Sequence, residues 1–109
     1  MPQRYTSLKD FYPFYLKEHS NKTCRILHFI GTFLVFALLI AGITTQVWWL
    51  LLLIPLVGYG FAWVGHFFYE KNKPATFQYP GYSLASDFKL FFDLLTGKRK
   101  FNPEDENHQ

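Results

Sequence analysis

The chain contains one long apolar run, from Ile26 to Tyr69, in which no lysine, arginine, aspartate or glutamate occurs. A small soluble helical bundle exposes one face of every helix to water, so an uncharged run of this length is typical of a segment in lipid. The polar stretch from Gly42 to Gln46 divides the run into segments at about 26–43 and 47–69. At 1.5 Å per residue these would be about 27 and 34 Å long, close to the ~30 Å hydrocarbon thickness of a bilayer. The pattern predicts a hairpin of two transmembrane helices.

The segment before the apolar run has the periodicity of an amphipathic helix. Its apolar positions recur every three or four residues and end at His19; they are Leu8, Phe11, Tyr12, Tyr15 and Leu16. We expect this helix to lie along the membrane interface, with His19 directed toward the membrane.

The segment after the run begins with a loop from Asn72 to Tyr82. A second amphipathic helix is predicted from its cap, Ser83, to Thr96, with one apolar face made by Leu84, Phe88, Phe91, Phe92 and Leu95. The predicted fold class is therefore an all-α membrane protein, in which two interfacial amphipathic helices flank a transmembrane hairpin. We expect a single domain over residues 1–100 and a disordered polar tail at 101–109.

Composition and charge predict the orientation. Half of the residues are hydrophobic, 21% are aromatic, and the net charge is +3. All 11 basic residues lie outside the apolar run and none lies in its turn, so both termini are expected in the cytoplasm, at a bacterial inner membrane or the endoplasmic reticulum. The basic residues do not form one stripe, so no nucleic-acid surface is expected. The single cysteine, Cys24, cannot form an internal disulfide.

Each transmembrane segment has a face of small residues beside a histidine. The small residues are Gly31 and Gly42 in the first segment, and Gly58, Ala62 and Gly65 in the second. Small residues let helices approach closely in lipid, so these two faces are predicted to pack together. Both ends of the hairpin lie on one side, and His28 and His66 would then lie ~3 to 5 Å below the same surface.

The histidines and one carboxylate form a candidate metal site. His66 and Glu70 are four residues apart and share a face if the helix is α-helical as far as Glu70. Imidazole and carboxylate groups at the edge of an apolar region suit a metal ion. We therefore expect His19, His28, His66 and Glu70 to converge, and Asp87 to be a first-turn carboxylate of the last helix instead.

Polar residues next to these ligands are candidates for contact with the ligands or with a substrate. They are Lys22, Arg25, Lys71, Asn72 and Lys73. Anchoring to lipid headgroups is the alternative role for the basic ones. Asn21 either caps the first transmembrane helix or contributes near the site.

The order of the polar motifs resembles that of a known family. The motifs are His19-x-Asn21, His28-x-x-Gly31 and Gly65-His66-x-x-x-Glu70, followed by Pro74-Ala75. They resemble, over about residues 5 to 97, the family of small membrane proteins whose yeast member is a 2-hydroxy fatty acid dioxygenase. The resemblance implies ligands at the three histidines, Glu70 as the acid and Asn21 as the family's asparagine. It also implies an Fe(II) cofactor and an O₂-dependent α-oxidation that shortens long-chain 2-hydroxy fatty acids by one carbon.

Two other functions remain open from the residues. His28 and His66 could be axial haem ligands in a small membrane protein, which would leave His19 and Glu70 without a role. The hairpin could also be non-catalytic and bind lipid or shape the membrane, with its histidines as packing groups. Two helices enclose little volume, so we expect either a homodimer or a packing role for the amphipathic helices.

Overall fold

The computed structural model describes residues 5–73 and 78–104, and every regular element in these ranges is helical. The elements in order are α1 (Leu8–Lys17), α2 (Lys22–Thr45), η1 (Trp48–Leu52), α3 (Leu53–Val64), η2 (Gly65–Glu70) and α4 (Pro80–Thr96). The predicted all-α class is confirmed for this part of the chain. Most of the expected disordered tail, residues 105–109, lies outside it, as do residues 74–77.

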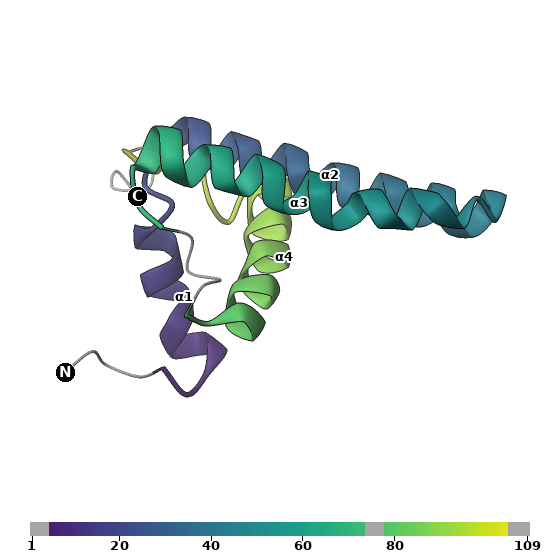
Figure 1. Cartoon of the computed structure of the whole chain (residues 1–109). Helices are drawn as coiled ribbons and strands as arrows, with labels where there is room; N and C mark the ends of the chain where they lie inside the picture. Colours follow the sequence, from purple (N-terminus) through teal and green to yellow (C-terminus); the bar gives the residue numbers. More distant parts are fainter. Residues whose placement is uncertain (1–4, 74–77, 105–109) are drawn as a thin grey trace.

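α2 and the segment from η1 to η2 form a long antiparallel hairpin that extends beyond the other helices (Figure 1). α2 begins four residues before the predicted boundary because Asn21 caps it. The side-chain oxygen of Asn21 accepts the backbone N–H groups of Thr23 and Cys24 at 2.8 and 3.2 Å. Both arms, Lys22–Thr45 and Trp48–Glu70, are long and apolar enough to cross a membrane.

The second arm changes its helical type twice. It begins as a 3₁₀-helix, becomes α-helical in α3, and ends as the π-helix η2. Pro55 lies in the first turn of α3, immediately after the 3₁₀-helix, and proline is tolerated in the first turn of an α-helix. A π-helix pairs residues five apart and not four, so the α-helical offset assumed for His66 and Glu70 does not apply.

Glycines of the two arms face the opposite arm, as their pattern predicted. A Cβ added to Gly31 would lie 2.9 Å from Cβ of Phe61, and one added to Gly65 would lie 2.9 Å from Sγ of Cys24. Both distances are shorter than a van der Waals contact, so a side chain at either position would push the arms apart. The absence of a side chain at Gly65 brings η2 close to α2 at the level of the histidines.

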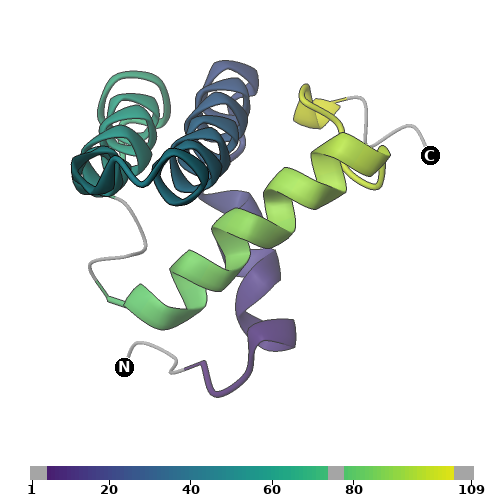
Figure 2. The ribbon, with the colours of Figure 1, turned by 90° about the vertical axis from the view of Figure 1, so that its right-hand side faces the viewer.

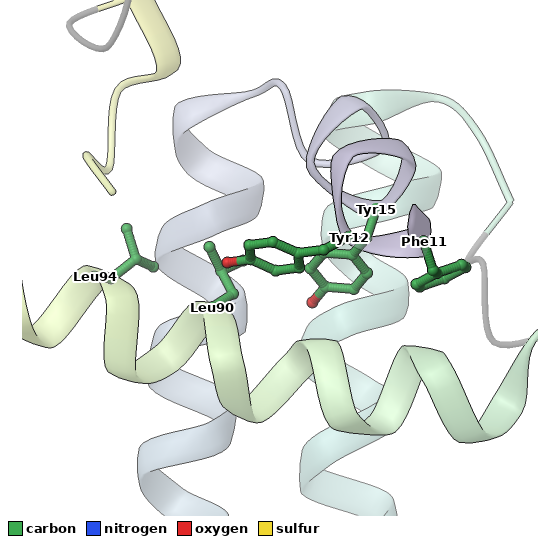
Figure 3. Packing of buried hydrophobic residues seen from close by; sticks show 5 residues of the cluster. All are labelled: Phe11, Tyr12, Tyr15, Leu90 and Leu94. Carbon is green, nitrogen blue, oxygen red and sulfur yellow. The ribbon is translucent and has the colours of Figure 1, made fainter. Parts of the chain in front are cut away.

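α1 and α4 pack against each other beside the base of the hairpin (Figures 1 and 2). Phe11, Tyr12 and Tyr15 extend from α1 toward α4, where they meet Leu90 and Leu94 (Figure 3). The two apolar faces thus partly cover each other, which is the packing role expected for the amphipathic helices, and their position at a membrane interface stays a prediction.

α4 also differs from its predicted start. It begins at Pro80, a residue suited to the first helical position, so Ser83 lies inside the helix and is buried instead of capping it. α4 then crosses α2 through aromatic contacts. The rings of Phe29 and Phe91 stack with their centroids 4.7 Å apart, and those of Phe36 and Phe88 lie 5.4 Å apart. The packed pair of α1 and α4 is called the α1–α4 layer below. The aromatic contacts attach this layer to the hairpin.

Candidate metal centre

Three histidines from different parts of the chain meet at the base of the hairpin. His19 follows α1, His28 belongs to α2 and His66 belongs to η2, and their exposed fractions are 1, 7 and 2%. Nε2 of His19 lies 2.9 Å from Nε2 of His28 and 3.0 Å from Nε2 of His66. The structure therefore brings together the three histidines that were predicted from the sequence to share one site.

The other nitrogen of each ring faces a carbonyl or amide oxygen. The pairs are His19 Nδ1 with the Tyr15 carbonyl at 2.8 Å, His28 Nδ1 with the Cys24 carbonyl at 3.3 Å, and His66 Nδ1 with Asn72 Oδ1 at 2.8 Å. The Asn72 amide orientation is consistent, because its nitrogen donates to the carbonyl of Glu18 at 3.3 Å. Such oxygens only accept, so each Nδ1 carries the hydrogen and each neutral ring has its lone pair on Nε2.

The three Nε2 lone pairs thus point into one small region. Acceptors about 3 Å apart repel one another unless a proton or a cation lies between them. Protonation is disfavoured, because burial and the neighbouring His28 and His66 hold the pKa of His19 well below its ordinary value. A metal ion fits: nitrogens at right angles around an ion, with bonds of about 2.1 Å, are themselves about 3 Å apart.

Cys24 lies in the same group without having been predicted there. Its Sγ and one nitrogen from each of the three histidines all lie within 4.8 Å of one another. However, Sγ is 3.9 Å from Nδ1 of His28, on the side of that ring away from Nε2, and it packs against Gly65. We therefore assign Cys24 a packing role and its carbonyl the role of orienting His28. The spacing of four residues between Cys24 and His28, which puts both on one face of α2, could have predicted that Cys24 lies near the histidines.

The structure does not place Glu70 among the converging nitrogens. Its Oε2 accepts the backbone N–H of Asn21 at 2.6 Å and its Oε1 accepts the hydroxyl of Ser20 at 3.1 Å. These contacts hold the N-terminal end of α2, where the helix dipole favours a negative charge. The π-helical turn of η2 explains the difference from the expected ligand role, since that expectation assumed an α-helix.

The carboxylate that does lie beside the histidines is Asp87. Its Oδ1 is 3.6 Å from Nε2 of His28 and accepts the hydroxyl of Tyr15 at 2.5 Å. Burial raises the pKa of Asp87 to about 7, although the hydrogen bond from Tyr15 lowers it. The sequence predicted only a helix-dipole role for Asp87. The contact arises where α4 crosses α2, and residue spacing contains no information about that crossing.

Tyr15 contacts the centre in two further ways. Its ring stacks on the ring of His19 with the centroids 4.0 Å apart, and its carbonyl orients the same histidine. Its own hydroxyl remains protonated, because burial and the nearby Asp87 raise the pKa of Tyr15 well above its ordinary value.

Arg25 is buried and contacts the backbone of His19, which corresponds to the first of the two roles expected for it, contact with the ligands. It is 2% exposed, and its Nε donates to the carbonyl of His19 at 2.7 Å while Nη1 donates to the carbonyl of Lys100 at 2.8 Å. The guanidinium thus holds the backbone of a histidine in place. Lys22, Lys71 and Lys73 are exposed near the same end of the hairpin.

Together these features define an all-helical hairpin protein with a buried three-histidine centre suited to a metal ion. A family model described as "2-hydroxy-palmitic acid dioxygenase Mpo1-like" matches residues 5–99. The chain belongs to this Mpo1-like family, and the matched region includes α1 to α4 and the three histidines of the centre. No curated protein and no solved structure gives a significant match.

Proposed function

We propose that this protein is an Fe(II)-dependent membrane dioxygenase that shortens 2-hydroxy fatty acids by one carbon. The observation that carries the proposal is the convergence of the Nε2 atoms of three histidines in a buried site. The description of the family, which refers to the dioxygenation of 2-hydroxy-palmitic acid, supports the class of reaction.

His19, His28 and His66 would hold the ion. When bound, Fe(II) supplies the redox chemistry with O₂ and a positive centre for the carboxylate and 2-hydroxyl oxygens of the acid. The overall reaction balances without a further reductant: the 2-hydroxy acid and O₂ give the shortened acid, CO₂ and water.

The residues around the histidines keep them in a single orientation. The carbonyls of Tyr15 and Cys24 and the amide of Asn72 hold each ring in the tautomer that presents Nε2. Burial of the rings keeps bulk water from the centre. Asp87 and the hydroxyl of Tyr15 lie on one side of the centre, where they could position the 2-hydroxyl group by hydrogen bonding.

We place the hairpin across a bilayer, with the histidines near the cytoplasmic surface and both termini on that side. A fatty acid has its carboxylate at the surface and its alkyl chain in the bilayer, so its head would meet the centre directly. The exposed Lys22, Lys71 and Lys73 would attract anionic lipid and substrate headgroups at the same end.

The test measures bound iron and O₂ consumption with 2-hydroxypalmitic acid for detergent-purified protein. Replacing His19, His28 or His66 by alanine should remove most of the iron and the activity. His108→Ala, which changes the fourth histidine of the chain, is the matched control and should behave as the wild type. Retention of iron and activity after loss of both His28 and His66 would instead favour a non-catalytic hairpin, and a Soret band would favour haem.

A further inference from the structure

An apolar groove begins at the metal centre and runs along the hairpin. It has a volume of about 230 Å³ and is lined by residues of α2, α3 and α4. His28 and Asp87 lie in its wall, and so does Thr32 one turn further along α2. The rest of its lining is apolar apart from the hydroxyl of Tyr59, so the charged and ligand-bearing side chains all lie toward the histidines.

The lining residues show how the groove is built. Along α2 it extends from His28 to Val35, and along α3 from Ala62 to Ile54, about 10 to 12 Å at 1.5 Å per residue. α3 and α4 each pack against α2, so α2 forms the floor between them. Tyr59 on α3 and Leu84 on α4 line the groove and are 45 and 53% exposed, so it opens to the outside between these helices.

We propose that this groove binds the alkyl chain of the 2-hydroxy fatty acid, a proposal that rests on the proposed function. The groove joins an apolar channel to a metal-binding polar end, which matches a molecule with one chelating head and one hydrocarbon chain. The groove also runs along the hairpin from the histidines toward the turn. An acyl chain whose head lies at the membrane surface beside the histidines would point in the same direction.

A second groove on the other side of the hairpin lacks these properties. It is lined by Leu27, Leu56, Val57, Gly60, Phe61 and Val64, all of them apolar or glycine. None of the three histidines and no carboxylate lines it, so it provides no place for the head of the acid. It serves as an internal comparison, because both grooves include a glycine of α3.

The two glycines make a matched pair of variants. A Cβ on Gly58 would lie 3.4 Å from Cγ2 of Val35, so a leucine there would enter the proposed groove. A Cβ on Gly60 would meet no atom within 4 Å, and a leucine there would lie in the second groove. Leu84→Trp narrows the proposed groove from α4 and leaves the packing of α2 against α3 untouched.

The experiment compares kcat/KM for 2-hydroxypalmitic acid and 2-hydroxyhexanoic acid in each variant, with bound iron as the control for folding. Gly58→Leu and Leu84→Trp should lower the ratio of long-chain to short-chain kcat/KM about tenfold, the factor expected when roughly two methylene groups lose their contacts. Gly60→Leu should leave the ratio unchanged. An unchanged ratio in Leu84→Trp with wild-type iron content would overturn the groove assignment while the dioxygenase function stood.

A binding measurement separates the groove from the reaction. The probe is 2-hydroxypalmitic acid with a photoreactive diazirine in its chain, irradiated under anaerobic conditions with the full-length protein. Cross-links should form at Ile54, Tyr59 or Leu84 and decrease in Leu84→Trp. Cross-links confined to Leu56 and Val64 would refute the groove. If the wild type consumed no O₂ with either acid, the proposed function would fail, and the cross-linking sites would still decide whether the groove binds the chain.

Discussion

Asn72 provides the sharpest test of how the metal centre is organised. Its Oδ1 accepts the Nδ1 hydrogen of His66 at 2.8 Å, while its amide nitrogen is 3.3 Å from both the carbonyl and the carboxylate of Glu18. Asn72→Ala removes the acceptor and leaves His66, which is 2% exposed, free to rotate or to change tautomer. In the other tautomer Nε2 carries the hydrogen and cannot bind a metal.

The size of the effect follows from two independent magnitudes. Leaving a buried donor without its partner costs about 1–3 kcal/mol. Removal of a residue that orients a metal ligand typically lowers metal affinity about 10- to 100-fold, which equals about 1.4–2.7 kcal/mol. The two ranges agree. Binding should be weakened and not abolished, because His19 and His28 keep their own acceptors.

The assay is anaerobic titration of detergent-purified apoprotein with Co(II), followed by its absorption bands. Asn72→Asp keeps an acceptor at the same position and should bind Co(II) more tightly than Asn72→Ala, although repulsion from Glu18 reduces the gain. Asn102→Ala is the control, since the side chain of Asn102 accepts the local backbone N–H of Glu104 and lies in the C-terminal segment. Wild-type Co(II) affinity in a folded Asn72→Ala protein would refute the assignment of the His66 tautomer.

Two further predictions concern the carboxylate at the end of η2 and the topology. Glu70→Gln should leave Co(II) affinity close to that of the wild type. It should lower the free energy of unfolding by about 0.3–1 kcal/mol, because it removes a charge at the N-terminus of α2. A large loss of bound metal would identify Glu70 as a ligand instead. In a Cys24→Ala background, a cysteine at Thr45 should react only with reagents on the side opposite the termini, and modification from the side of the termini would contradict a hairpin that crosses the membrane.

The hairpin and the convergence of the histidines could be predicted from the sequence, because they follow from the apolar pattern and from helix geometry. An uncharged run interrupted once by polar residues indicates two apolar helices. Antiparallel pairing then puts His28 and His66 at the same level. Two features could not be predicted in this way. The π-helical turn at Gly65–Glu70 depends on tertiary contacts of η2, and the position of Asp87 depends on where α4 crosses α2.

Tyr15 has both a role that its spacing predicts and contacts that only the structure shows. Its spacing assigns it to the apolar face of α1, and the structure does bury it between α1 and α4. The same residue orients His19 through its carbonyl, stacks on the ring of His19 and donates to Asp87. The hairpin alone contributes only two of the three histidines, so the centre is complete only when the α1–α4 layer is packed. A metal that binds this arrangement and not the unfolded chain must therefore stabilise that packing, and the aromatic core of the layer contributes to metal affinity without touching the ion.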